Sequence, residues 1–330
     1  MNLLVIAPVL LPLLAGILLL LLPQSRLTLH RTLSVMAVAA QIGLALALMA
    51  TVNNSDILVY TLGNWPAPFG IVLVADRLAA WMLVITALLA LFALLYAIRG
   101  DDTVGRHFHT LFQFQLFGLN GAFLTGDLFN LFVFFEILLL ASYGLLLHGG
   151  RRQRTRAGLH FVVINLAGST LFLFAVGTLY GVLGTLNMAD LAIKVAAAPP
   201  ENVPLVRAAG LLLFGVFALK AALLPLYLWL PAAYAHTSAP VAALFAIMTK
   251  IGAYSILRVY TLIFGPEAGP AANLIEFWLL PLALATLIVG MIGAVASAHL
   301  RQQAAYLVVA SVGSLLTAFG LNSHAGIAAG

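Results

Sequence analysis

Residues 217–231 read FALKAALLPLYLWLP, so that a lysine and two prolines interrupt an otherwise apolar stretch. Pro225 and Pro231 have no N–H group, and each therefore leaves a helix carbonyl four residues earlier without its usual partner. Within lipid, such carbonyls persist only where protein or a water-filled cavity satisfies them. The stretch therefore predicts a transmembrane helix that is broken beside an intramembrane Lys220, as in the ion sites of many transporters. A simple proline kink is the alternative.

The composition around this stretch is that of a membrane protein. Hydrophobic residues make up 63% of the 330 residues, and charged residues only 8%. Apolar runs of about 20 residues, enough to cross a hydrocarbon core about 30 Å thick, recur along the chain. We expect an all-α polytopic membrane protein with spans at 3–22, 32–52, 72–98, 109–125, 128–148, 158–183, 205–230, 239–261, 276–298 and 303–321. Residues 327–330 resemble the start of another span, so we expect the chain to stop inside a larger membrane domain.

Several classes of protein and site are excluded by the same composition. Cysteine is absent, which excludes a disulfide framework, a thiolate metal site and iron–sulfur ligation. The net charge of +5 comes from basic residues in short loops, a topological pattern that argues against nucleic acid as a partner. Residues 1–22 lack the basic segment and the cleavage site of a signal peptide. No phosphate loop, nucleophile elbow, metal-ligand spacing or dinucleotide fingerprint is present, and we expect no cofactor and no metal.

The distribution of Lys and Arg predicts the orientation. With the N-terminus outside, nine of these residues lie in cytoplasmic loops: Arg26, Arg31, Arg99, Arg106, Arg151, Arg152, Arg154, Arg156 and Arg301. Four lie on the opposite side, at Arg77, Lys194, Arg207 and Arg258, and two lie within spans. The run at 151–156 is interpreted as a topology anchor, with binding of lipid phosphates or a partner as the alternative. The longest outer connection, 187–204, is expected to be a surface loop or a short helix.

Three ionisable residues, Glu136, Lys220 and Lys250, lie near the middle of apolar spans. A charged residue such as Lys or Asp at the centre of a bilayer helix costs about 2.5–3.5 kcal/mol on insertion scales. Glu136 lies about 13.5 Å along a helix from Asp127, and Tyr143 shares its face. Desolvation raises a carboxyl pKa and a nearby ammonium lowers it, so a reversible Glu–Lys contact would switch protonation. The alternative for Glu136 is a protonated carboxyl that only joins helices.

Lys250 lies about eleven residues into its span, too deep to extend easily to an interface. A buried amine loses its proton more readily than one in water, which suits a proton relay. His236 falls between the two lysines in sequence and titrates near neutral pH, so we weigh a relay equally against a hydrogen-bonded spacer. Asn165 and Ser169 share a span and are interpreted as packing residues, with water coordination as the alternative. Five histidines near predicted cytoplasmic helix ends are interpreted as interfacial residues, with a proton entry route as the alternative for some of them: His107, His109, His148, His160 and His299.

At these residues the chain resembles the antiporter-like membrane subunits shared by respiratory complex I, membrane-bound hydrogenases and Mrp-type sodium/proton antiporters. The segments 63–76 and 125–143 are most similar to the D subunits of the Mrp (Pha, Mnh) antiporters. The pattern from Lys220 through WLP at 229–231, His236 and AP at 239–240 to Lys250 and GAY at 252–254 matches the wider family. The resemblance covers essentially the whole chain.

The resemblance implies about fourteen helices, in which two inverted five-helix repeats, each with a broken helix, follow three N-terminal helices. By this interpretation 10–11 helices are present: residues 1–100 form the N-terminal segment, 101–262 the first repeat, and 263–330 the incomplete start of the second. Position by position, Glu136 matches the essential carboxylate of the fifth helix, Lys220 and Lys250 the lysines of the seventh and eighth, and His236 a histidine common between them.

The function implied by the resemblance is secondary transport rather than enzymatic catalysis. We expect a subunit of a multisubunit antiporter in a bacterial inner membrane, which exchanges protons for Na⁺, or K⁺, together with other subunits and in contact with membrane lipid. One alternative is a proton-pumping subunit of a complex I or hydrogenase type oxidoreductase. Another is a scaffold of helices without transport, in which neutralising the buried charges would leave activity intact.

Overall fold

The computed structural model describes residues 3–55, 57–150 and 152–329. Across these residues the chain forms thirteen α-helices and one short β-hairpin. Nine helices in the described part are long and apolar enough to cross a membrane. The helix α4 (Phe108–Leu124), with 17 residues, is about 26 Å long and falls just short of that group. The expected all-α polytopic membrane architecture is confirmed.

Packing divides the chain into two compact units. The first comprises Met1–Thr155 and Thr237–Ile247, and the second comprises Arg156–His236 and Met248–Gly330. The long helix α10 (Ala239–Leu262) contributes to both. These units follow packing rather than repeat symmetry, so the expected boundaries after residues 100 and 262 and the inverted repeats stay predictions.

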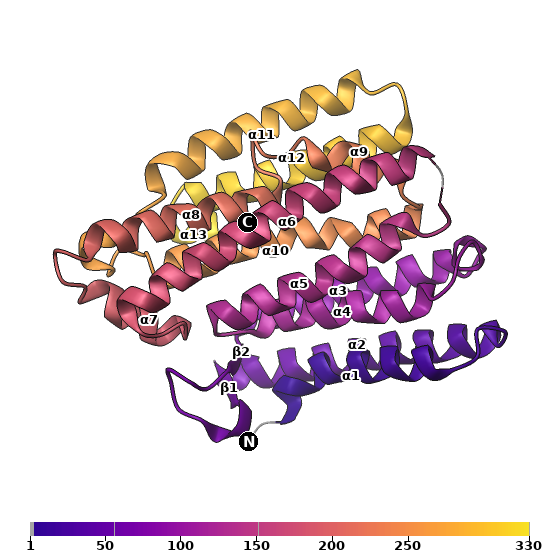
Figure 1. The fold of residues 1–330 in the computed structure, drawn as a ribbon, viewed down its shortest axis with the longest axis horizontal. Helices are drawn as coiled ribbons and strands as arrows, with labels where there is room; N and C mark the ends of the chain where they lie inside the picture. Colours follow the sequence, from indigo (N-terminus) through magenta and orange to yellow (C-terminus); the bar gives the residue numbers. More distant parts are fainter. Residues whose placement is uncertain (1–2, 56, 151, 330) are drawn as a thin grey trace. The chain divides into compact units, whose positions relative to one another are not determined.

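The first unit is a bundle of apolar helices in which α4 is central (Figure 1). It contacts α1 and α5 extensively, and glycines permit the close approach. A Cβ at Gly118 would lie 2.7 Å from the backbone nitrogen of Leu138, and one at Gly16 would lie 2.6 Å from the ring of Phe114. The helices of this unit are α1 (Leu3–Leu21), α2 (Leu27–Ser55), α3 (Arg77–Ala97), α4 and α5 (Leu128–Leu147).

Buried polar side chains satisfy a backbone carbonyl that a proline leaves without its helix partner inside α1. Pro12 cannot donate to the carbonyl of Pro8, which would otherwise be unsatisfied in an apolar interior. The amides of Gln41 and Asn120 both donate to that carbonyl, at 3.0 and 2.9 Å. Two polar residues from α2 and α4 are therefore buried because of one proline in α1.

The expected span at 72–98 is wrong at its start. Residues 72–75 form strand β2 (Val72–Ala75), which pairs antiparallel with β1 (Leu58–Thr61), and the helix begins only at Arg77. The alternation of Val, Leu and Val suits a strand, and Asp76 then caps α3 by accepting from the N–H of Ala79 at 2.8 Å. The turn-rich segment after β1 contains a single 3-10 turn, η1 (Leu62–Asn64), in which Gly63 has a positive φ of 63°.

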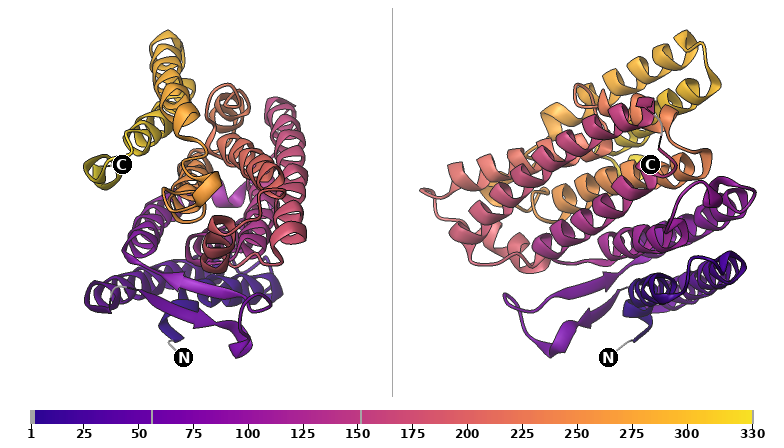
Figure 2. Two further views of the ribbon diagram at one scale, coloured as in Figure 1. Left: turned by 90° about the vertical axis from the view of Figure 1, so that its left-hand side faces the viewer. Right: turned by 45° about the vertical axis from the view of Figure 1, so that its right-hand side comes forward.

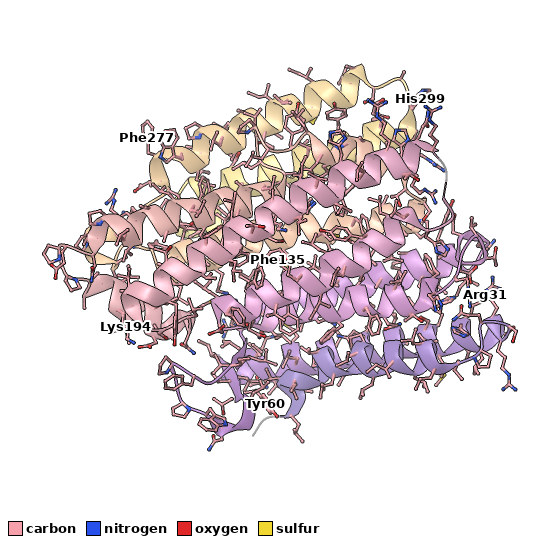
Figure 3. The ribbon with its side chains drawn as sticks, in the orientation of Figure 1. Arg31, Tyr60, Phe135, Lys194, Phe277 and His299 are labelled. Atoms are coloured by element: carbon pink, nitrogen blue, oxygen red, sulfur yellow. The ribbon has the colours of Figure 1, made fainter. Side chains whose placement is uncertain are left out.

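The loops predicted to be cytoplasmic meet at one end of this unit. Asp102, in η2 (Asp101–Thr103), accepts two hydrogen bonds from Arg31, at 2.7 and 2.9 Å, and lies 3.1 Å from the ring nitrogen of His109. His148, after α5, contacts the carbonyl of Asp101 at 3.2 Å and receives a hydrogen bond from Arg154 on its own carbonyl. Of the basic run at 151–156, Arg151 lies outside the described residues. Figure 3 shows Arg31 at the end of the unit opposite to Tyr60 of the hairpin.

We expect Asp102→Asn to destabilise the protein by about 1–3 kcal/mol at pH 7, because Arg31 loses its charged partner. Burial alone would raise the pKa of Asp102, but the hydrogen bonds from Arg31 and His109 outweigh it and hold that pKa below its usual range. A lowered pKa stabilises the fold above the unfolded value of about 4, and this stabilisation disappears as the pH falls through the folded value. The difference in melting temperature between wild type and variant in detergent should therefore persist from pH 8 to pH 5 and shrink only in stronger acid.

The control for this prediction is Asp190→Asn. Asp190 forms an i,i+4 ion pair with Lys194 at 3.2 Å, and both side chains are partly exposed. Exposed pairs of this kind contribute little. An equal loss of stability in the two variants would contradict a special role for the buried Asp102.

The second unit contains the broken helix and the helix pairs around it. Its helices are α6 (Arg152–Leu183), α7 (Met188–Ala196), α8 (Val203–Ala221), α9 (Trp229–His236), the later part of α10, α11 (Glu276–Ala296), α12 (Leu300–Gly320) and α13 (His324–Ala329). Figure 2 shows α11 and α12 side by side, in orange and yellow, where a Cβ at Gly290 would lie 2.5 Å from the backbone of Ala310. The expected connection at 187–204 contains α7, which Asn187 caps by accepting from Ala189 and Asp190.

Candidate functional site

The expected span at 205–230 is two helices separated by a non-helical segment. α8 ends at Ala221, and Ala222 takes a left-handed conformation with φ of 60°. Ala222 donates to the carbonyl of Leu219 at 3.1 Å and Leu223 donates to that of Ala218 at 2.9 Å, the pattern of a Schellman helix end. The helix therefore ends four residues before Pro225, and α9 begins after that proline. The predicted break is confirmed, and it is a full interruption rather than a kink.

Neighbouring groups supply hydrogen-bond partners for the backbone of the non-helical segment between α8 and α9. The indole N–H of Trp229 donates to the carbonyl of Leu219 at 3.1 Å, and the N–H of Leu224 donates to the hydroxyl of Thr286 at 2.8 Å. Pro231 has no N–H to donate to the carbonyl of Tyr227, and this carbonyl instead accepts a hydrogen bond from the N–H of Leu230 at 3.0 Å. Irregular backbone at membrane depth is stable only when protein or water satisfies it in this way.

Lys220 lies in the last turn of α8, directly before the break, and is only 4% exposed. Its ammonium lies 3.4 Å from the carbonyl and side-chain oxygens of Asn165 and 3.4 Å from the hydroxyl of Ser169. The amide of Asn165 donates to Phe161, which orients its side-chain oxygen toward the lysine. The carbonyl end of a helix also favours a cation. The buried ammonium is therefore supported by α6 and by its own helix terminus.

Two glycines bring neighbouring helices against this end of α8. A Cβ at Gly252 of α10 would lie 2.4 Å from the backbone nitrogen of Ala221 and 2.8 Å from the carbonyl carbon of Lys220. A Cβ at Gly168 of α6 would lie 2.5 Å from the side chain of Leu219. No side chain can fit where Gly252 meets backbone, so this contact positions the break between α6 and α10.

Lys250 lies on α10, two residues before Gly252, and contacts a different helix. Its ammonium donates to the hydroxyl of Ser311 on α12 at 2.6 Å, and that hydroxyl donates to the carbonyl of Val308 at 2.8 Å. Lys220 thus contacts α6, whereas Lys250 contacts α12. The two lysines occupy separate hydrogen-bonded positions within the same unit.

Glu136 belongs to the first unit, on α5. Asp127 caps this helix by accepting from the N–H of Asn130 at 2.8 Å, which places Glu136 nine residues into the span as predicted. One carboxyl oxygen of Glu136 is buried and has no hydrogen-bond partner within the described part of the chain. A buried carboxyl oxygen without such a partner is costly, which makes this residue a candidate for a functional group rather than a packing one.

His236 lies at the exposed end of α9. It lines an open cleft of about 740 Å³ together with residues from the start of α12, among them His299 and Arg301. The sequence places His236 between the two lysines, but the structure places it at this surface cleft. Its role as a relay residue stays a prediction.

Sequence reasoning did not assign functional roles to four of the residues in this site. Asn165 and Ser169 were expected to pack between helices, yet both accept hydrogen bonds from the ammonium of Lys220. Their i,i+4 spacing places two polar side chains on one face of an apolar helix, and this pattern could have indicated a buried polar partner. Ser311 and Thr286 carry no such signal, because single hydroxyl residues are common in membrane helices.

Residues 125–330 match the family described as "NADH:quinone oxidoreductase/Mrp antiporter, TM". The chain belongs to this family. All four predicted site residues, Glu136, Lys220, His236 and Lys250, lie within the matched region, whereas α1 to α4 and the hairpin precede it.

Relatives within this family include two bacterial proteins that are named as antiporter D subunits. The chain is 48% identical to the D subunit of a probable K⁺/H⁺ antiporter of Rhizobium meliloti (strain 1021), over 99% of this chain and 61% of the relative. It is 42% identical to the D subunit of a Na⁺/H⁺ antiporter of Bacillus subtilis (strain 168), over 98% of this chain and 64% of the relative. The chain thus spans less than two thirds of the length of these family members.

Solved structures show the same fold. A chain of the Mrp complex from Dietzia sp. DQ12-45-1b aligns with a TM-score of 0.86 and 33% identity, covering 97% of this chain and 59% of that one. A chain of respiratory complex I from Thermus thermophilus aligns with a TM-score of 0.81 and 27% identity, covering 98% of this chain and 66% of that one. The family fold is therefore shared by antiporter and oxidoreductase complexes.

Proposed function

We propose that this chain belongs to the D subunit of a multisubunit cation/proton antiporter in a bacterial inner membrane, with its N-terminus outside. The subunit translocates protons through Glu136, Lys220 and Lys250, and the proton motive force drives export of a monovalent cation. His236, at the end of α9, is the fourth residue of the proposed proton route. No enzymatic reaction is part of this function.

The observation that carries the proposal is the buried Lys220 beside a broken helix. Lys220 is only 4% exposed, and a charged side chain within a membrane domain lowers the stability of the fold. Because a purely structural helix bundle would be more stable without this charge, Lys220 indicates a functional role. Its ammonium lies 3.4 Å from oxygens of Asn165 and Ser169, and a lysine amine, unlike a guanidinium, can hold or release a proton. A change of protonation at Glu136, on α5 of the first unit, and the transfer of a proton from Lys220 toward Lys250 are parts of the proposal.

The relatives' names support the antiporter and leave the cation open. The 48% identical relative is named as part of a K⁺/H⁺ antiporter, and two relatives at 42% and 40% identity are named as parts of Na⁺/H⁺ antiporters. We propose Na⁺ or K⁺ as the exchanged cation. A proton-pumping role in an oxidoreductase is the second candidate, because chains of a sulfane sulfur reductase and of complex I share the fold with TM-scores of 0.87 and 0.81.

The test is cation-dependent dequenching of a pH-gradient dye in inverted vesicles. We expect vesicles that contain the complete subunit and its partner subunits to respond to Na⁺ or K⁺, and liposomes with the purified subunit alone to give no response. Exchange by the subunit alone would contradict the need for partners. Quinone reductase or hydrogenase activity that co-purifies with the subunit, without cation exchange, would favour the second candidate.

A further inference from the structure

The cleft between α9 and the start of α12 is lined by several hydrogen-bond donors, among them the cationic Arg301. Arg301, Gln302 and Tyr306 line it from α12, and His236 and His299 line it from the adjoining helix ends. Its volume of about 740 Å³ lies within the range of small-molecule sites. Every one of these side chains can donate a hydrogen bond, and the guanidinium offers a planar fork that matches phosphate oxygens.

The charge of the cleft has one sign. No carboxylate is among its lining residues in the described part of the chain. The four acidic residues of this unit are Asp190, Glu201, Glu267 and Glu276, and they lie in or next to α7, before α8 and around the connection to α11. Figure 3 shows Lys194 of α7 and His299 at opposite ends of the unit. The cleft therefore has an unbalanced positive field that favours an anion.

The walls of the cleft add an apolar component. Leu228 and Leu300 line it and are 70% and 80% exposed. Leu228 directly precedes α9 and Leu300 is the first residue of α12, and both line the cleft together with Arg301. A free inorganic anion would gain nothing from these side chains, whereas acyl chains would cover them. Basic pockets at the ends of transmembrane helices are also a recognised mode of lipid headgroup binding.

We propose that this cleft binds the phosphate headgroup of an anionic phospholipid. Arg301 and His299 hold the phosphate oxygens, Gln302 and Tyr306 add neutral hydrogen bonds, and the acyl chains lie against Leu228 and Leu300. A lipid in this position bridges the far end of the broken helix to α12. The site is separate from Lys220 and Lys250 but shares its cleft with His236, and its occupancy can be measured without any transport.

The experiment uses the complete subunit within its complex, reconstituted in nanodiscs. The chain has no cysteine among residues 1–330, so Ala232→Cys on the cleft wall supplies a labelling site for a bimane fluorophore. The complex without this substitution, labelled in the same way, gives the background. Dibrominated phosphatidylglycerol and dibrominated phosphatidylcholine are compared as quenchers over a range of mole fractions.

We expect phosphatidylglycerol to reach half-maximal quenching at a mole fraction about fivefold lower than phosphatidylcholine, and Arg301→Gln to remove most of this preference. His299→Gln should weaken it to a smaller extent and serves as a second variant if Arg301→Gln does not assemble. The matched control is Arg156→Gln, an exposed arginine of α6 outside the cleft, which should leave the preference unchanged.

Three results would overturn the proposal. Equal quenching by the two lipids would show that the cleft does not select an anionic headgroup. Displacement by millimolar inorganic phosphate, without any lipid preference, would assign the cleft to a free anion. Loss of preference in Arg156→Gln as large as in Arg301→Gln would show attraction by the general surface charge and not by this cleft.

Discussion

We expect Glu136→Gln to reduce cation-driven proton exchange to the background of vesicles that lack the complex. Glutamine has nearly the same size as glutamate but cannot bind or release a proton, so it removes the chemistry and keeps the shape. The carboxyl lies mid-span on α5, with one oxygen buried and without a hydrogen-bond partner among the described residues. A protonated carboxyl that only joined helices would be replaced by the amide with little change. The measurement is dye dequenching in inverted vesicles after addition of Na⁺ or K⁺.

The matched control is Glu201→Gln, which changes an exposed carboxylate in the connection before α8. It should keep wild-type exchange, and both variants should be recovered in the membrane with their partner subunits. Normal dequenching by the Glu136→Gln complex would exclude this residue from the proton route.

Lys220→Arg and Lys220→Ala should both be inactive. Arginine keeps the positive charge that a carboxylate partner would need but remains protonated, so it cannot relay a proton. The site gives a lysine neutral oxygens from Asn165 and Ser169, and Gly252 of α10 packs against the backbone of residues 220 and 221. If Lys220 only anchored an ion pair, arginine would retain much of the exchange activity and alanine would lose it. The two variants are compared over a range of pH in the same vesicle assay.

Lys194→Arg on α7 is the control, since it makes the same substitution at a partly exposed ion pair. Subunit assembly and melting temperature of the three complexes separate a lost relay from a lost fold. Near-normal exchange by Lys220→Arg, with an inactive Lys220→Ala, would reject the relay and leave Lys220 an electrostatic role.

Most of the membrane helices could be predicted because the bilayer imposes their length and apolarity. The expected span at 3–22 is α1 (Leu3–Leu21), and that at 239–261 is α10 (Ala239–Leu262). The span at 72–98 was wrong at its start, because an apolar run is equally compatible with a strand and a helix. Pairing between β1 and β2, together with the Asp76 cap, decided the conformation there.

The sequence by itself determined that the chain crosses a membrane several times, that Glu136, Lys220 and Lys250 lie within apolar spans, and that a helix breaks near Pro225. Each of these follows from local chemistry: apolar length, the cost of buried charge, and a missing N–H group. Only the tertiary structure decided that the helix ends at Ala221, that Asn165 and Ser169 receive the ammonium of Lys220, and that Ser311 receives that of Lys250. Those partners lie 51 to 61 residues away in the chain, and helix packing through small residues such as Gly252, rather than any local pattern, brings them together.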